Sequence, residues 1–273
     1  MLPTGDPDWA SVDIAVPRLP LRLPGISMAG FRQRAPAPVN IAMVAHPSVT
    51  LLIDLSDGEG LAYETDGRHG HGSVVAGLLP GGLRTGGQVG ECLQIRLEPA
   101  LATAVFGAPD LTGTVASLRD LWGHGAEQAE NALRAAASWD ERFTLATDFL
   151  ARRLGARPEV DPEIAHTWRR TLTHRGRVQI NALADEVGWS RKRLLARFRA
   201  QLGITPKRAA RLIRFDHAAH LLATGHAPAA VAATTGYVDQ PHLHREVKSF
   251  TGLTPSAVAV APWLAIDRTT WPH

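Results

Sequence analysis

The fold of this chain is decided by one stretch of sequence, GYVDQPHLHREVKSFTGLTP at residues 236–255. A similar stretch, one residue shorter, occurs upstream as GWSRKRLLARFRAQLGITP at residues 188–206. In both copies a small residue, Ala184 or Ala232, stands four positions before the first glycine. Two crossing helices joined by a tight turn need glycine at the turn and a small residue at their contact. The repeat therefore predicts two helix-turn-helix units in tandem, joined by a long helix that starts at Pro206.

The second helix of each unit carries the candidate binding residues. It is expected to begin after a capping residue, Ser190 in the first unit and Asp239 in the second. Leu194 and Phe198, and their counterparts in the second unit, are spaced by four residues and are expected to face inward. The outer sides are then polar and basic, which suits contacts with base edges or phosphates in a DNA major groove. The predicted DNA-binding residues are Arg191, Lys192, Arg193, Arg197, Gln240, His242, His244, Arg245 and Lys248.

Charge divides the chain into two unequal parts. From Met1 to Thr167 there are 13 arginines and 20 acidic residues, a net charge of −7. From Trp168 to Pro255 there are 15 basic and 5 acidic residues, a net charge of +10. A basic segment beside an acidic one indicates a polyanionic partner for the C-terminal part alone.

The tandem pattern resembles the DNA-binding domain of the AraC/XylS family of transcriptional regulators, over about residues 164–258. The stretch at residues 236–255 carries most of the resemblance, together with the Gly-x-Thr-Pro ending of both units. The resemblance implies that the second helix of each unit enters successive major-groove segments on one face of the DNA. Ala196 departs from the family pattern, which usually has arginine two residues before Phe198. The base-reading positions implied by the resemblance are Lys192, Gln240, His242 and Arg245.

The N-terminal part is predicted to contain a small β-sheet followed by helices. Short apolar runs at residues 49–55, 73–79 and 92–97 are typical of strands. Residues 1 to about 38 are rich in proline and predict an irregular arm, and helical spacing begins after Pro109. The resemblance implies a sensing or dimerising domain, often a cupin-like barrel.

One helix of this part carries a clear starting signal. Ser138 and Glu141 form a capping box, and the apolar stripe that follows extends to Leu154. The stripe is either a dimerisation face or part of the core, and the family resemblance favours dimerisation.

We therefore expect an α+β protein with three segments. Residues 1–157 form the N-terminal effector-sensing or dimerisation domain, with a linker at Arg157 and Pro158. Residues 158–260 form an all-α DNA-binding domain, whose first helix is capped by Asp161. Residues 261–273 form a tail.

Several other residues were candidates for chemistry. His69 and His71 have the His-x-His spacing that begins the metal motif of cupin enzymes, but the expected downstream glutamate is missing and flanking glycines favour an exposed loop. Cys92 is typical of a buried small side chain rather than a redox sensor. No catalytic constellation is recognisable, so we expect no enzyme activity, metal site or cofactor. Three residues of the long helix are expected to face solvent: Asp216, His217 and His220.

The sequence favours a cytoplasmic, sequence-specific transcription regulator, acting as activator or repressor. One cysteine excludes an internal disulfide, and the first residues lack the features of a secretory signal. The expected partners are double-stranded DNA, a small-molecule effector, a second protomer and, for an activator, RNA polymerase, with no membrane. The alternative is a metal-dependent cupin-type enzyme or sensor with a DNA-tethering domain, which would use His69 and His71.

Overall fold

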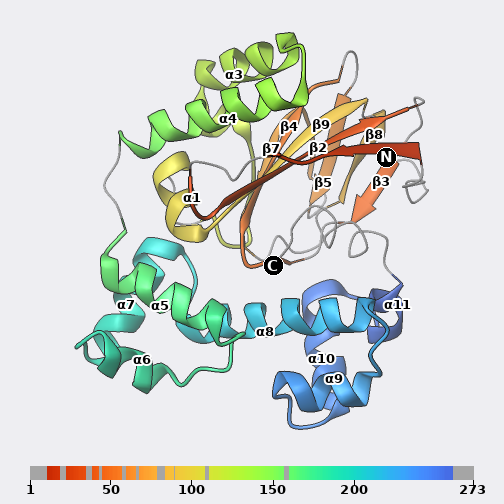
Figure 1. Cartoon of the computed structure of the whole chain (residues 1–273). Helices are drawn as coiled ribbons and strands as arrows, with labels where there is room; N and C mark the ends of the chain where they lie inside the picture. The colour runs from red at the N-terminus through yellow and green to blue at the C-terminus, as the bar shows by residue number, and fades with distance from the viewer. Residues whose placement is uncertain are drawn as a thin grey trace.

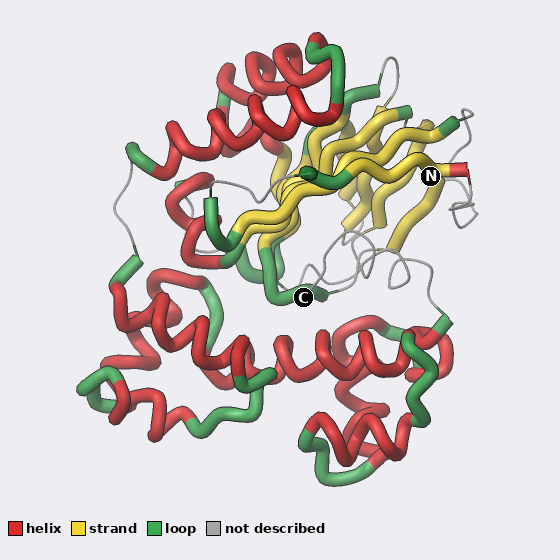
Figure 2. The backbone as a smooth tube through the Cα atoms, in the orientation of Figure 1, coloured by secondary structure: helices red, strands yellow, loops and turns green. Residues whose placement is uncertain are grey.

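The protein divides into a part that contains the sheets and a part made of helices, as the computed structural model shows (Figures 1 and 2). The structure describes residues 11–18, 23–34, 39–42, 45–56, 60–65, 68–78, 84–88, 90–107, 111–156 and 160–260. The predicted linker at residues 157–158, the tail at 261–273 and the turns at 57–58, 66–67 and 80–82 lie outside these residues. An N-terminal domain with β-sheet and helices followed by an all-helical domain confirms the predicted fold class.

Two antiparallel sheets form the N-terminal domain (Figure 1). The larger has the order β1 (Val12–Ala15), β2 (Ile26–Gln33), β9 (Glu91–Leu97), β4 (Val49–Asp54), β7 (Val74–Ala76) and β10 (Val115–Ser117). The smaller has the order β3 (Val39–Ala42), β8 (Arg84–Gln88), β5 (Gly60–Thr65) and β6 (Arg68–His71). The predicted strands at residues 49–55, 73–79 and 92–97 are confirmed as β4, β7 and β9.

The prediction of an irregular arm before residue 38 is wrong, because β2 is an interior strand. It pairs with β9 from Ile26 opposite Leu97 to Arg32 opposite Glu91. Both faces of β2 are covered at its centre, where Met28, Ala29 and Gly30 are all buried, so this part does not alternate between apolar and polar as in a half-buried strand. Gly30 lies directly beneath the ring of Trp139, where a Cβ would come within 2.2 Å of a ring carbon.

The helices in the described part of the N-terminal domain are α1 (Pro99–Phe106), α2 (Leu118–Trp122), α3 (His124–Ala135) and α4 (Trp139–Leu154). Helices therefore start ten residues earlier than the predicted start after Pro109, and β10 interrupts them. Helices α3 and α4 lie over one face of the larger sheet (Figure 1). The predicted Ser138 cap of α4 is confirmed, since Ser138 Oγ accepts from the Glu141 amide, but Glu141 Oε2 accepts from the amide of Ala137, one residue before the expected Ser138.

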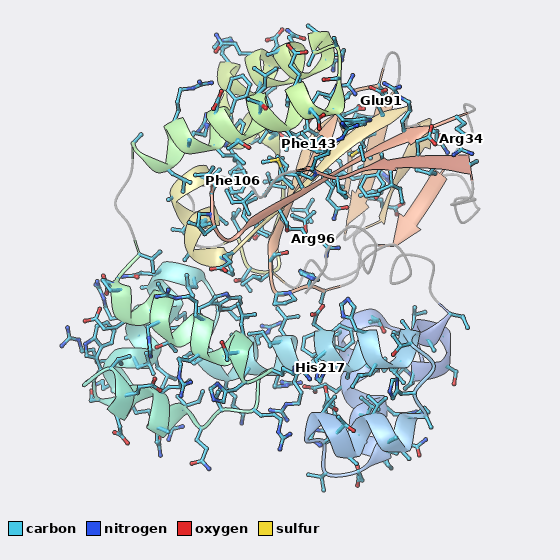
Figure 3. All side chains as sticks on the ribbon, viewed as in Figure 1. Arg34, Glu91, Arg96, Phe106, Phe143 and His217 are labelled. Atoms are coloured by element: carbon cyan, nitrogen blue, oxygen red, sulfur yellow. The ribbon has the colours of Figure 1, made fainter. Side chains whose placement is uncertain are left out.

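The apolar stripe of α4 is used as core within the chain. Phe143, Ala146 and Leu150 are buried against the sheet and its neighbouring helices. The adjacent Arg142 is itself buried and forms an ion pair of 2.6 Å with Glu91 of β9 (Figure 3 labels Phe143 and Glu91). The interpretation of this stripe as a dimerisation face is therefore wrong.

Over its described residues, 160–260, the C-terminal domain contains helices and no strands. The helices are α5 (Pro162–Thr173), α6 (Ile180–Glu186), α7 (Arg191–Leu202), α8 (Pro206–Ala223), α9 (Pro228–Thr235), α10 (Gln240–Thr251) and α11 (Pro255–Ala259). Helix α8 crosses the domain, with α5, α6 and α7 toward one end and α9, α10 and α11 toward the other (Figure 1). Trp168, Phe198 and Phe215 are fully buried in this core. No helix in the described residues is long and apolar enough to cross a membrane.

Candidate nucleic-acid interface

The first helix-turn-helix unit consists of α6 and α7. Gly188, between them, has φ of 67°, a left-handed conformation that glycine adopts without strain. The Trp189 amide donates to the carbonyl of Ala184 at 2.9 Å, which closes the turn over the small residue. Ser190 Oγ accepts from the Arg193 amide at 3.2 Å and caps α7, as predicted.

The second unit, α9 and α10, repeats this geometry. Gly236 has φ of 78°, and the Tyr237 amide donates to the carbonyl of Ala232 at 3.0 Å. Asp239 Oδ1 accepts from the His242 amide at 2.7 Å and caps α10. The predicted turn glycines, small contact residues and caps are therefore confirmed in both units.

The inward and outward faces of α7 and α10, the two recognition helices, also follow the prediction. Leu194 and Phe198 in α7, and Leu243 and Val247 in α10, are fully buried. The predicted DNA-binding side chains lie on the surface, except that His242 is half-buried with its ring edge-on to buried Tyr237. The exposed ones are Arg191, Lys192, Arg193, Arg197, Gln240, His244, Arg245 and Lys248.

These cations differ in what they already contact. The Arg193 guanidinium lies over the Trp189 ring, 4.4 Å from its centroid. Arg197 donates to Asp161 at the start of α5, at 2.6–2.9 Å. Within the described residues, no ion pair joins Lys192, Arg245 or Lys248 to a carboxylate, so these cations are available to a ligand.

Helix α8 holds the two units together. The Thr205 hydroxyl caps its first turn by accepting from the Arg208 amide at 3.3 Å, and one face of the helix is buried along its length. The loop between α5 and α6 packs closely against α8: a Cβ on Gly176 of this loop would lie 2.1 Å from the carbonyl oxygen of Ala210. Arg214 of α8 donates to the Gly176 carbonyl at 3.3 Å, and its guanidinium lies 5.6 Å from the Tyr237 ring centroid. The loop before the first unit is thus fixed beside the turn of the second.

Comparisons with known proteins agree with this geometry. Residues 183–259 match the family model described as a helix-turn-helix domain. YbfI of Bacillus subtilis (strain 168), an HTH-type transcriptional regulator, is 41% identical over 66 residues, which is 24% of this chain and 24% of that protein. The C-terminal domain is a helix-turn-helix domain of the AraC type. The matched part spans about a quarter of the length of YbfI.

Two solved structures are similar to all or part of the chain. ToxT from Vibrio cholerae O395 aligns over 89% of this chain and 98% of its own, with 11% identity and a TM-score of 0.47. A transcriptional regulator with an AraC-type DNA-binding domain from Chromobacterium violaceum aligns over 41% of this chain and 96% of its own, with 19% identity and a TM-score of 0.34.

The AraC-type domain contacts the N-terminal domain through α8 and α7. The prediction that Asp216 and His220 face solvent is wrong, because their side chains are only 16% and 13% exposed. Asp216 Oδ1 lies 3.5 Å from Nε2 of His46, and Arg96 of β9 lies 3.3 Å from the same nitrogen. Figure 3 places Arg96 on the side of the sheet that faces α8. The sequence gives no signal for this cluster of His46, Arg96 and Asp216. These residues are far apart in the chain and come together only where the two domains are in contact.

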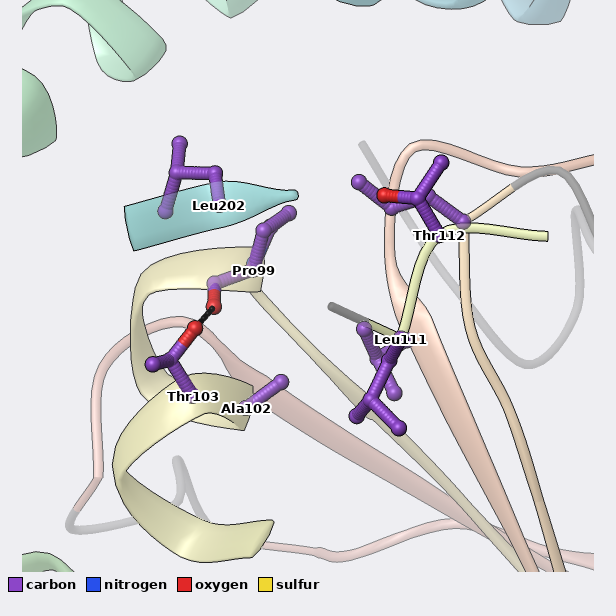
Figure 4. A pocket seen from close by; sticks show the side chains of 8 residues that line it. Pro99, Ala102, Thr103, Leu111, Thr112 and Leu202 are labelled. Atoms are coloured by element: carbon purple, nitrogen blue, oxygen red, sulfur yellow. Dashed lines mark hydrogen bonds between the residues drawn. The ribbon is translucent and has the colours of Figure 1, made fainter. Parts of the chain in front are cut away.

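A small hollow lies where α1 meets α7 (Figure 4). Pro99, Ala102 and Thr103 form one side of it and Leu202 of α7 closes it. Its volume of about 10 Å³ holds a single water molecule, so this hollow does not admit an effector. Thr103 Oγ1 donates to the carbonyl of Gln201 at 2.8 Å and joins the two domains beside it.

The other candidate residues lie apart from the AraC-type domain. His69 and His71 lie on β6, so the expectation of a loop is wrong, and His69 Nδ1 is 3.9 Å from Glu64. Across the described residues, no three histidine, cysteine or acidic side chains are placed to hold a metal ion. Cys92 is buried in β9, and this burial raises the pKa of its thiol.

Proposed function

We propose that this protein is a sequence-specific, DNA-binding transcription regulator. The observation that carries the proposal is the pair of equivalent, capped helix-turn-helix units braced on one helix. Helix α8 has 18 residues and is about 27 Å long, comparable with the ~34 Å that separates successive major grooves on one DNA face. A bracing helix of this length suits the placement of the two units on neighbouring groove segments.

The exposed residues divide into two kinds of contact. Cations that neutralise phosphates release counterions, and log affinity then falls with log salt concentration at about −0.9 per contacted phosphate. Arg245 and Gln240 on α10 have the donor geometry that pairs with guanine and adenine edges, and His242 and Lys192 complete the proposed base-reading set. Arg191, Arg193, His244 and Lys248 are assigned to phosphate and flanking contacts.

The N-terminal domain is proposed to modulate binding. The domain contacts support this role, because they reach the end of recognition helix α7 through Gln201 and the bracing helix α8 through Asp216. The two helix-turn-helix units would need one arrangement that binds DNA and another that does not. A small molecule or a second protomer on the N-terminal domain would then change DNA affinity if it bound these two arrangements with unequal affinity.

Capture of genomic DNA on the purified full-length protein, repeated across a salt series, tests the proposal. We expect enrichment of a few sites that share two short sequence blocks about one helical turn apart, ~10 base pairs. Uniform capture of all fragments, lost steeply with salt, would show a non-specific basic binder and reject sequence-specific regulation. A protein in which Lys192, Arg245 and Lys248 are all changed to Ala serves as the control and is expected to enrich nothing.

A further inference from the structure

The two recognition helices carry a charged residue at the same position, six residues before the glycine that ends each helix. It is Arg197 before Gly203 in α7 and Glu246 before Gly252 in α10. Both glycines are left-handed C-caps, with φ of 69° and 72°, so the helices end alike and their positions correspond. The charges are opposite in sign, and each forms a two-pronged ion pair with a neighbouring helix.

In the first unit, the partner of Arg197 is Asp161. Nε and Nη2 of Arg197 donate to the carboxylate of Asp161 at 2.8 Å and 2.6 Å. Asp161 stands at the N-cap position of α5, as predicted, but its carboxylate makes no capping hydrogen bond. Its amide donates to Oε1 of Gln201, and hydrogen bonds from Gln201 and then Arg197 lower the pKa of its carboxyl group. Helix α7 is thus fastened to the start of α5 at two points.

In the second unit, the partner of Glu246 is Arg211 of α8. Nε and Nη2 of Arg211 donate to the two carboxylate oxygens at 2.9 Å and 2.8 Å. The Glu246 side chain is only 7% exposed, and its hydrogen bond raises the pKa of Arg211. Glu246 repels phosphate and lies against the protein, so its position in α10 serves to attach the helix rather than to contact DNA.

The residue one place earlier points outward in both helices. It is Ala196 in α7 and Arg245 in α10, and both are exposed. The position that carries a guanidinium for base contacts in the second unit therefore carries only a methyl group in the first. A methyl group lets the backbone approach the groove closely and can contact a thymine methyl.

From this correspondence, and resting on the proposed function, we infer that Arg197 is a positioning residue. Its ion pair with Asp161 sets the angle of α7 against α5, as Glu246 and Arg211 set the angle of α10 against α8. The sequence predicted that Arg197 contacts DNA. In this assignment it holds α7 in place instead. Base discrimination by arginine falls to the second unit, while the first is held at close approach to the groove.

The test uses the full-length protein and a duplex that the wild-type protein selects from a random DNA library. The specificity ratio, affinity for this duplex over affinity for its scrambled version, is measured across a salt series. For Arg197→Ala we expect the ratio to fall about 5-fold or more, as for one mismatched base pair, with no change in the salt slope. For the exchange of charges, Asp161→Arg with Arg197→Asp, we expect the ratio to recover relative to Arg197→Asp alone.

Arg191→Ala is the matched control, because it removes an exposed cation of α7 that is assigned to a phosphate and that no ion pair joins to a carboxylate in the described residues. We expect it to reduce the salt slope by about 0.9. The same loss of slope in Arg197→Ala, without recovery in the charge exchange, would make Arg197 a phosphate contact and overturn the assignment. An unchanged ratio would overturn it as well. Thermal melting checks that each variant folds. If Arg197→Ala does not fold, Asp161→Asn tests the same ion pair. A wild-type protein that selects no sequence would instead reject the proposed function.

Discussion

Among single residues, Arg245 is the one to which we assign the main base contact. It is exposed on α10, and no carboxylate in the described residues holds it. We expect Arg245→Ala to weaken binding to the selected duplex by about 1–3 kcal/mol and to relax specificity at one base position, because one two-pronged base contact is lost. Fluorescence titration with duplexes that vary one base at a time measures both effects.

Lys248→Ala is the comparison for this change. Lys248 lies three residues further along the same helix and is also exposed. We expect it to weaken all duplexes alike and to lower the salt slope by about 0.9, because an ammonium on a phosphate carries no sequence information. Equal loss on every duplex for Arg245→Ala too would contradict its assignment as a base-reading residue.

Among elements, the loop between α5 and α6 makes a close backbone contact with α8. Gly176 and Gly188 both have left-handed backbones, with φ of 72° and 67°, so alanine costs similar strain at each. Only at Gly176 would the added Cβ meet backbone, at 2.1 Å from Ala210 O, whereas nothing lies within 4 Å at Gly188. We expect Gly176→Ala to reduce the free energy of unfolding by about 1–3 kcal/mol more than Gly188→Ala. Urea denaturation compares the two, and equal losses would show that the loop moves off α8 without cost.

The caps give a second prediction at this scale. The Asp239 carboxylate satisfies the His242 amide at the start of α10. We expect Asp239→Ala to lower the free energy of unfolding by about 0.5–2 kcal/mol, and Asp239→Asn to lower it much less, because asparagine also caps well. Thermal unfolding with both variants checks this, and equal effects would mean that the hydrogen bond contributes little.

The elements that could be predicted from sequence are those whose signals are local. Ser190 and Asp239 each cap the helix that follows, and Gly188 and Gly236 each allow a turn whatever the rest of the chain does. Strand β2 was missed because its partners in β9 lie about 60 to 70 residues away and because Trp139 covers Gly30 from α4. The pair of Arg197 and Asp161 was missed for the same reason, although aligning the two units shows that positions 197 and 246 carry opposite charges.

For the whole molecule, the contact between the domains is the feature through which the proposed modulation would act. His46 and Asp216 are both mostly buried where the domains meet and lie 3.5 Å apart. We expect His46→Ala and Asp216→Ala to destabilise the protein non-additively, with a coupling energy of about 0.5–3 kcal/mol. Denaturation of the two single variants and the double variant measures it. Strict additivity would mean that the domains do not share this contact in solution.

The opposite charges at positions 197 and 246 have a consequence for the orientation of the bound protein. Exchanging the two recognition helices would set Arg197 against Arg211 and Glu246 against Asp161, two repulsive encounters in place of two attractive ones. The halves of the AraC-type domain are therefore not interchangeable, and the two ends of the domain are distinguishable. On DNA such a molecule would bind in one direction only. Inverting its binding site would turn the N-terminal domain toward the opposite flank, so a site next to a promoter would give two different complexes in its two orientations.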